Sequence, residues 1–424
     1  MTATARSETV AVRVDPALLP EIKRFGAFDV DACFNCGNCT AMCPLSVGDS
    51  AFPRRIIRYA QVGMKDELLA SKELWTCYSC GECSETCPRQ AEPSEFMAAS
   101  RRYATASYDR TRIARFLYLQ PLWGTIAAIA LAVLFGLFMF VNRAGPLPSD
   151  DAGMAFFEWI PAALIHDFGL VAMILVFIAG LAGVLTMIGR TAPASGIAWR
   201  ELGNREGLRA VGSSLWSSLG VESLGQKRYR EDRDSTEDAL PLWRRTWFMH
   251  AATMLGFLGL LLATTLDFGL DIIGWKHTGE QVPIWYPVRL LGTVAGLMMM
   301  YGATGLMMRR WRKDGRTVRR SFTSDWTFLW LLWLAGLTGF VIELALYLPE
   351  PPVWGYLGFL IHVAIAIVVI AVGNIGRIVV INDEVVARRC PNIDQIRMIQ
   401  LEAGVEYAYD HTFAQSKLMS IGNP

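Results

Sequence analysis

Eight cysteines near the start of the chain have the residue type and spacing of a metal site. They form two runs, CFNCGNCTAMCP from Cys33 and CYSCGECSETCP from Cys77, with identical internal spacing and a proline after the last cysteine. Thiolate sulfur is a soft ligand that suits iron–sulfur clusters and zinc. Zinc sites usually pair two CxxC units and leave no spare cysteine before a proline. The repeated run therefore favours two 4Fe–4S clusters over zinc.

The fourth cysteine of each run is expected to bind the cluster of the other run. The three cysteines of a CxxCxxC turn can occupy three corners of one cubane, whereas the fourth precedes a proline and points away. The ninth cysteine, Cys390, stands alone in RRCPN and is interpreted as structural or incidental. The two predicted ligand sets are Cys33, Cys36, Cys39 and Cys87 for one cluster, and Cys77, Cys80, Cys83 and Cys43 for the other.

The segment between the runs predicts helices rather than a small ferredoxin sheet. The gap is too long for the shortest bacterial ferredoxin, and it contains FPRRIIRYAQVGMKDELLASKELWTC. Apolar residues recur there at helical spacing. We therefore expect a mostly helical, ferredoxin-like domain around two clusters. The residues that carry the spacing are Ile56, Ile57, Ala60, Met64, Leu68, Leu69 and Leu74.

The rest of the chain has the composition of an integral membrane protein. The 424 residues are 53% hydrophobic and 19% charged, which favours membrane helices. The net charge of +1 gives no sign of a nucleic-acid partner. The start, MTATARSETV, lacks an apolar stretch. We therefore expect no cleaved signal, and a cysteine-rich part that stays in the reducing cytoplasm.

Six apolar stretches after residue 115 are long enough to span a membrane. Three of the flanking segments are rich in arginine, among them RRWRKDGRTVRR from Arg309, and the other three loops are poor in Lys and Arg. The positive-inside rule then places both termini in the cytoplasm, in a multi-pass protein of the cytoplasmic (inner) membrane. The predicted spans are Pro121–Val141, Ala162–Ile188, Trp247–Leu266, Val288–Met308, Trp326–Tyr347 and Gly355–Val372.

This organisation predicts a mostly α-helical chain in three parts. Residues 1–115 form the cytoplasmic iron–sulfur domain, and residues 116–385 form a six-helix transmembrane bundle, which the resemblance given below implies to be cytochrome b-like. The bundle includes a cytoplasmic connection over residues 191–241, which is too long for a plain turn. Residues 386–424 form a cytoplasmic tail.

The first part resembles the small iron–sulfur C subunit of heterodisulfide reductase. The resemblance is carried by CFNCGNCTAMCP, FPRRIIRYAQVGMKDELL, WTCYSCGECSETCPRQAEP and the following MAASRR. The membrane part resembles the gamma-subunit family of respiratory nitrate reductase, a haem b anchor that oxidises quinol. A fusion of the two in this order is similar to the C-subunit family of the quinone-interacting membrane-bound oxidoreductase (Qmo) complex.

The resemblance implies an electron-transfer subunit. Electrons would pass between menaquinone or another quinone, haem b and two 4Fe–4S clusters. Soluble, flavin-containing partner subunits that are heterodisulfide reductase A-like would connect the two clusters to adenylylsulfate reductase in sulfur metabolism. The first part has no GxGxxG fingerprint and no catalytic triad, so we assign no separate reaction to this chain. One alternative is a related complex that serves another soluble reductase. The other is a haem-free anchor that holds an iron–sulfur protein at the membrane.

Haem b in such a bundle needs axial imidazoles from two helices. His166 and His362 follow the tryptophan at the outer start of their spans by similar distances along the chain, so they should lie at similar depth. His250 starts the third span near the cytoplasmic side and matches neither. Four possibilities stay open. They are one haem between His166 and His362, a haem that involves His250, two haems, and no haem. The alternative role of each histidine is a hydrogen-bonded helix contact.

Two carboxylates within the spans are candidates for proton handling at a quinone site. A carboxylate in hydrocarbon costs about 2.5–3.5 kcal/mol, so it usually faces a cavity or has a role. Asp167 adjoins His166, and Glu343 lies near the outer end of the fifth span. Quinol oxidation releases protons that either carboxylate could accept, although a helix-end acid can also simply reach the interface. A rival site on the cytoplasmic side is marked by Arg244, Arg245 and His250.

Overall fold

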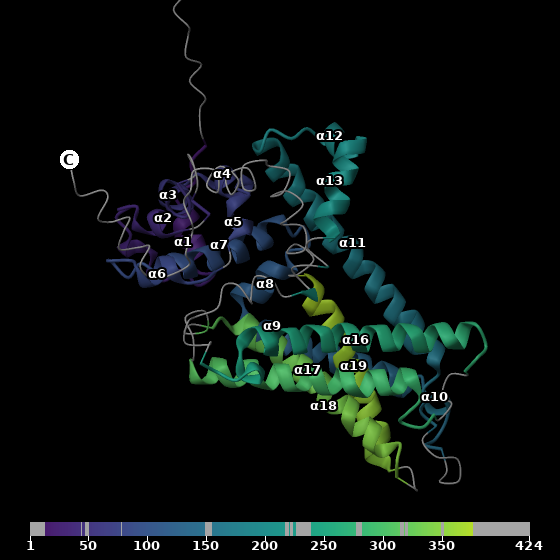
Figure 1. Ribbon diagram of the computed structural model, residues 1–424. Coiled ribbons are helices and arrows are strands. Elements are labelled where there is room, and N and C mark those ends of the chain that lie inside the picture. The colour runs from purple at the N-terminus through teal and green to yellow at the C-terminus, as the bar shows by residue number, and fades with distance from the viewer. Residues whose placement is uncertain are drawn as a thin grey trace, which may run out of the picture. The chain divides into compact units, whose positions relative to one another are not determined.

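The structure is a computed structural model (Figure 1), and it describes residues 13–43, 45–46, 51–77, 79–148, 155–216, 220, 224–225, 239–276, 282–313, 318, 321–348 and 352–375. These residues contain helices and no β-strand, which confirms the predicted α-helical fold. They form two compact units. The first takes the described residues up to 104 and residues 185–215, and the second takes the others. The domain boundary at residue 115 remains a prediction.

The first unit is built from short helices, as the sequence between the cysteine runs predicts. A 3₁₀ turn over Val30–Ala32 precedes the first run. The later helices α12 (Trp199–Gly203) and α13 (Arg205–Trp216) also belong to this unit. Its other helices are α1 (Leu18–Lys23), α2 (Asn38–Met42), α3 (Arg54–Val62), α4 (Lys65–Ala70), α5 (Glu73–Thr76), α6 (Glu82–Glu85) and most of α7 (Pro93–Tyr108).

Helix α3 shows how the sequence pattern produces this unit. Ile56, Ile57 and Ala60 share one face and are buried, as their spacing predicts. The helix ends at Gly63, whose φ is 79°. A Cβ at Gly63 would lie 2.5 Å from the carbonyl oxygen of Asp15, so only glycine fits. Other predicted helical positions that are fully buried are Leu68, Leu69 and Leu74.

The second unit consists mainly of long apolar helices. Figure 1 shows α16 and α17 running side by side. Helix α19 packs against α9 and α18. The helices of this unit are α8 (Ile113–Leu119), α9 (Pro121–Val141), α10 (Phe156–Trp159), α11 (Ala162–Ala194, up to residue 184), η4 (Leu242–Arg244), α16 (Thr246–Ile272), α17 (Pro287–Arg312), α18 (Thr323–Ala345) and α19 (Val353–Ile375).

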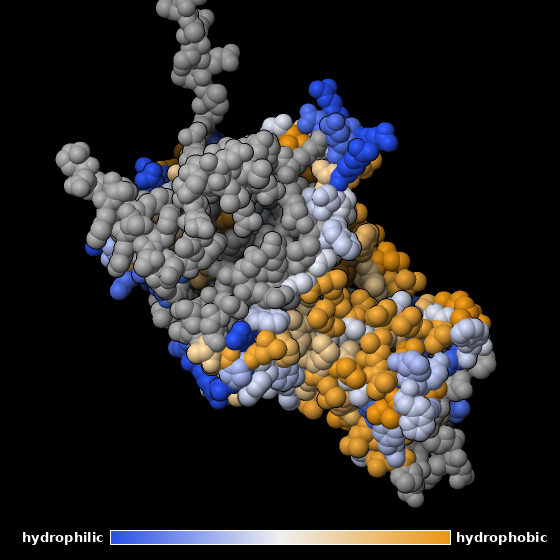
Figure 2. All heavy atoms as spheres, in the orientation of Figure 1, coloured by the Kyte–Doolittle hydropathy of each residue, from blue (hydrophilic) through white to orange (hydrophobic). Residues whose placement is uncertain are grey.

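Five helices among the described residues are long and apolar enough to cross a membrane. They are α9, α11, α16, α17 and α18. Each overlaps one of the first five predicted spans, and α9 has the predicted bounds, whereas the other four begin or end at different residues. Figure 2 shows orange, apolar atoms over much of the visible face of these helices. The sixth predicted span lies on α19, whose side chains are described up to Val369. The count of six spans therefore remains a prediction.

Aromatic contacts fix the short helix α10 to the start of α19. Phe156 stacks on Phe359 with ring centroids 4.6 Å apart, and Trp159 meets Tyr356 edge to face at 5.4 Å. The backbone N–H of Ala155 donates a hydrogen bond of 3.3 Å to the Tyr356 hydroxyl. Aromatic pairs contribute about 0.5–1.5 kcal/mol each beyond the area they bury. This cluster therefore holds one end of the bundle together.

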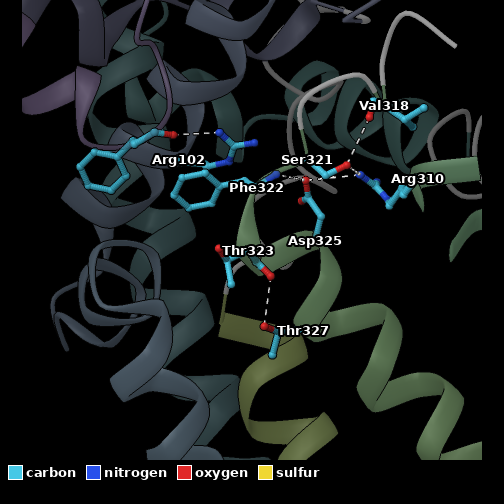
Figure 3. A network of polar contacts seen from close by, with 9 residues as sticks. Arg102, Arg310, Val318, Ser321, Phe322, Thr323, Asp325 and Thr327 are labelled. Atoms are coloured by element: carbon cyan, nitrogen blue, oxygen red, sulfur yellow. Dashed lines mark hydrogen bonds and ion pairs between the residues drawn. The ribbon is translucent and has the colours of Figure 1, made fainter. Parts of the chain in front are cut away.

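Arginine and aspartate organise the start of α18 (Figure 3). Arg310, at the end of α17, donates a hydrogen bond of 3.0 Å to the Ser321 hydroxyl and lies 3.5 Å from a carboxylate oxygen of Asp325. Asp325 in turn accepts a 3.2 Å hydrogen bond from the backbone N–H of Phe322. The carboxylate thus satisfies a backbone donor at the helix start and pairs with a cation at the end of the preceding helix.

Helices α16 and α17 approach so closely that the contact requires glycine. A Cβ on Gly256 of α16 would lie 2.5 Å from the backbone nitrogen of Met299. A Cβ on Gly302 of α17 would lie 2.3 Å from the carbonyl oxygen of Met249. Between apolar helices in lipid, small residues allow the close backbone packing that replaces a hydrophobic driving force.

We predict that Gly256→Ala destabilises the second unit, whereas Gly269→Ala on the same helix does not. The methyl group at position 256 must displace the backbone of α17, at a cost of about 1–3 kcal/mol. Nothing lies within 4 Å of a Cβ at Gly269. The measurement is the midpoint of thermal unfolding of the purified chain in mild detergent, which should fall only for Gly256→Ala. Equal midpoints for the two variants would contradict the close approach.

Candidate metal centre

The two cysteine runs follow the same backbone path. Asn35 and Ser79, each two residues after the first cysteine, have φ values of 60° and 57°. Gly37 and Gly81, two residues further on, have φ values of 90° and 89°. The short helices α2 and α6 begin directly after these glycines. Alternating left-handed residues curl each run tightly, so the sequence repeat is also a structural repeat.

The first run meets the last cysteine of the second run. Burial, and then the neighbouring thiolates of Cys33 and Cys36, raise the pKa of Cys39 to about 11. The thiolate of Cys87 raises it further, which places Cys87 near Cys39. These four cysteines are the predicted ligands of one cluster, and the structure brings them to one place.

The second run meets the last cysteine of the first run. Burial raises the pKa of Cys43 to about 12, and the thiolates of Cys77 and Cys80 raise it as well. Burial is also the main cause that raises the pKa of Cys83. The thiolates of Cys77 and Cys80, and then those of Cys43 and Cys39, raise it further. The structure therefore groups the other predicted set, and the contribution of Cys39 shows that the two groups are neighbours.

A recess of about 400 Å³, including its open mouth, lies among the second group. Its lining contains Cys43, Cys77, Cys80 and Cys83, together with apolar residues such as Phe52. Among the described residues, no three His, Cys, Asp or Glu side chains converge closely enough to hold a single metal ion. Four sulfur atoms around a recess suit a polynuclear cluster, in which each thiolate binds a different iron.

Backbone N–H groups point at two of the sulfur atoms. The N–H of Ser79 donates to Sγ of Cys77, and the N–H of Ala91 donates to Sγ of Cys87, both at 3.4 Å. Hydrogen bonds of this kind lower the electron density on cluster sulfurs and help to set the reduction potential. The fit of the site to iron–sulfur clusters thus extends beyond the cysteines themselves.

The three histidines considered for haem have different surroundings. His362 is half-buried on α19, and its Nδ1 lies 3.0 Å from the hydroxyl oxygen of Thr338 on α18. His166 is exposed on α11, and its ring meets Phe268 of α16 edge to face at 5.2 Å. His250 is half-buried on α16. His166 and His362 therefore face different helices, and their pairing remains a prediction.

Thr338 orients the His362 ring. Its hydroxyl donates to the carbonyl oxygen of Leu334 at 2.8 Å, and its oxygen lies 3.0 Å from Nδ1 of His362. If Nδ1 carries the ring proton, Nε2 keeps the lone pair that an axial imidazole requires. The spacing of the sequence does not indicate the role of Thr338, because that role depends on how α18 and α19 pack against each other.

Glu343 lies in a polar cluster at one end of α17 and α18. One of its carboxylate oxygens accepts a 2.8 Å hydrogen bond from the Thr293 hydroxyl and lies 3.9 Å from Nε of Arg289. The Arg289 guanidinium also lies over the Tyr347 ring, 4.8 Å from its centroid. The side chain of Glu343 is 20% exposed, whereas Asp167 is an exposed residue.

The arginines of the rival quinone site predicted from the sequence make local contacts. The Arg244 guanidinium lies 5.8 Å from the ring centroid of Trp243, and Nε of Arg245 donates to the carbonyl oxygen of Leu240 at 3.0 Å. His250 lies nearby in the sequence at the start of α16. These contacts anchor the chain before α16.

Residues 29–91 match the family of the 4Fe-4S dicluster domain. The chain is 36% identical over 77 residues to the C subunit of H(2):CoB-CoM heterodisulfide,ferredoxin reductase from Methanothermobacter thermautotrophicus, which covers 18% of this chain and 42% of that relative. It is 39% identical over 56 residues to the iron-sulfur C subunit of CoB--CoM heterodisulfide reductase from Methanopyrus kandleri, with coverages of 13% and 29%. No solved structure matches the chain.

The matched residues include all eight cysteines of the two runs. The chain spans less than half the length of these relatives. It carries a 4Fe–4S dicluster domain similar to the C subunit of heterodisulfide reductase, which confirms this part of the resemblance. Helices long and apolar enough to cross a membrane accompany that domain.

We predict that paired cysteine substitutions reveal the ligand sets through iron content. If Cys43 and Cys80 bind the same cluster, Cys43→Ala/Cys80→Ala should retain about four of about eight iron atoms, whereas Cys43→Ala/Cys36→Ala should retain almost none. The measurement is iron and acid-labile sulfide per chain after anaerobic purification. The opposite ranking would show that each run binds its own cluster. Cys390→Ala, outside the described residues, is the control and should keep all the iron.

Proposed function

We propose that this chain is a membrane electron-transfer subunit, which connects a quinone in the membrane to soluble redox partners. The observation that carries this function is the pairwise meeting of two four-cysteine runs in a chain whose described residues also contain five helices of membrane-crossing length. Iron–sulfur clusters supply one-electron carriers when bound. Cys33, Cys36, Cys39 and Cys87 would hold one cluster, and Cys43, Cys77, Cys80 and Cys83 the other.

The proposed placement in the cell follows from the arginine-rich loops. Residues 1–115 and 386–424 would lie in the cytoplasm, and residues 116–385 would form the bundle in the cytoplasmic membrane, with connection 191–241 on the cytoplasmic side. The basic end of α17, with Arg309, Arg310 and Arg312, supports this orientation. The sixth span on α19 would return the chain to the cytoplasm.

His362 is the best supported haem b ligand. Its ring is half-buried on α19, and its Nδ1 lies 3.0 Å from the hydroxyl oxygen of Thr338, which orients it. His166 would be the second ligand by depth, and His250 is the alternative. A haem between two imidazoles would supply a further one-electron carrier when bound.

Glu343 would accept a proton released by quinol oxidation. Within an apolar helix pair, its carboxylate already has a counter-charge in Arg289 and a donor in Thr293. A carboxylate held in this way is oriented and remains within reach of the surface. Asp167, which is exposed beside His166, is the second candidate.

The proposed partners follow from the resemblance to the Qmo family and to the nitrate reductase gamma subunit. They are flavin-containing, heterodisulfide reductase A-like subunits, linked to adenylylsulfate reductase, and menaquinone or another quinone. The names of the two relatives, both heterodisulfide reductase subunits, support a multi-subunit complex. A different soluble reductase as the final partner is the alternative within this function.

A haem-free anchor is the second candidate function, because His166 and His362 face different helices. In that function the helices only hold the iron–sulfur domain at the membrane. A reduced-minus-oxidised visible spectrum of the purified chain separates the two functions. A b-type alpha band supports electron transfer from quinone, whereas broad iron–sulfur bleaching alone supports the anchor.

We predict that His362→Ala and His166→Ala each remove haem b, whereas His250→Ala retains it. If two imidazoles share one haem, loss of either ligand should lower the content from about one haem per chain to nearly none. The measurement is the pyridine haemochrome of each purified variant, with iron–sulfur content as the control for folding. Haem loss only in His250→Ala would assign the haem site to the start of α16, where His250 lies.

We predict that Glu343→Gln slows quinol oxidation about 100-fold or more, because the amide cannot accept the proton. Haem and iron content should stay at the original level. Asp267→Asn is the matched control, since Asp267 is a carboxylate on α16 that pairs with Lys276. Unchanged turnover in Glu343→Gln would remove the carboxylate from the proposed mechanism.

A further inference from the structure

The two cysteine runs differ at one equivalent hydrogen bond. The carbonyl oxygen of Cys33, the first cysteine of its run, accepts from Nε2 of Gln61 at 3.0 Å. The carbonyl oxygen of Cys77, the first cysteine of the other run, accepts from Nη2 of Arg101. Since the runs share their backbone path, the two carbonyl groups are equivalent positions, although the donors come from different helices, α3 and α7. One donor is a neutral amide, and the other is a positively charged guanidinium.

Arg101 is held firmly against the second run. Its Nε donates to the carbonyl oxygen of Leu74 at 2.8 Å, while Nη2 reaches Cys77. Two bonds from one planar group to carbonyls three residues apart leave the guanidinium little freedom. The side chain comes from α7 and is half-buried. Its charge is therefore fixed beside the first proposed ligand of the second cluster.

Other charges lie near both runs. Glu82 lines the recess of the second run, and Nη1 of Arg54 would be 3.1 Å from a Cβ at Gly37 in the first run. Such charges would contribute to the difference between the two cluster potentials, whereas the effect of Arg101 would fall on the cluster of its own run.

We propose that Arg101 is a positioning residue that raises the reduction potential of the cluster held by the second run. Reduction adds one negative charge to the cluster, and a fixed cation in a partly buried site stabilises the reduced form more than the oxidised form. The same guanidinium braces the turn that carries Cys77. The inference rests on the proposed clusters, but it needs neither quinone nor partner proteins.

The test compares three variants of the full chain in detergent by redox titration followed with electron paramagnetic resonance. Arg101→Gln replaces the cation by the amide that the first run already uses, and should shift the potential of one cluster to more negative values. Arg101→Lys keeps the charge and should restore most of that shift. Arg102→Gln is the control, because it removes the neighbouring charge. Nη1 of Arg102 donates to the carbonyl oxygen of Phe25 at 2.8 Å (Figure 3), and this substitution should leave both cluster potentials unchanged.

The signal is assigned with Cys80→Ala, which should abolish the cluster that Arg101 affects. Retained iron with an unchanged potential in Arg101→Gln would overturn the inference, as would equal shifts of both clusters or an equal shift in Arg101→Lys. If Arg101→Gln loses the second cluster, Arg101→Lys becomes the deciding variant. A cluster potential in Arg101→Lys equal to that of the unmodified chain then supports the role of the charge, and a more negative potential overturns that role. Absence of iron from the unmodified chain would instead contradict the proposed function.

Discussion

Charge compensation at buried, crowded sulfur atoms is the constraint on which the first unit depends. Burial and neighbouring thiolates raise the pKa of Cys39 to about 11 and that of Cys43 to about 12. Thiols in this environment stay protonated unless a cation compensates the thiolate charge. Bound iron would supply that compensation, so cluster assembly would release protons and contribute to folding. The helices of the unit, with Ile56 and Ile57 in their core, hold the sulfurs together.

The second unit meets a different constraint, because lipid removes the hydrophobic drive that packs helices in water. Close backbone packing of α16 and α17 at Gly256 and Gly302 replaces that missing hydrophobic driving force. Polar groups then lie where another helix can satisfy them. His362 meets Thr338, and Glu343 meets Thr293 and Arg289. The positions proposed to do chemistry are thus the polar contacts between apolar helices.

Local spacing predicts much of this structure. The cysteine offsets predict which sulfurs meet, and the spacing of Ile56, Ile57 and Ala60 predicts a buried helix face. Counting along the spans predicts depth, but not which neighbour a helix faces. It gives His166 and His362 one depth, yet one meets Phe268 and the other Thr338. The donors Gln61 and Arg101 are equally hidden from local patterns, since they lie far along the chain from the carbonyls they bind.

The most direct test of the central claim is the metal and sulfide content of the anaerobically purified chain. Two cubane clusters require about eight iron atoms and about eight acid-labile sulfides per chain, with no zinc. Zinc bound without sulfide would contradict the account, because the eight cysteines would then serve a structural site that carries no electrons.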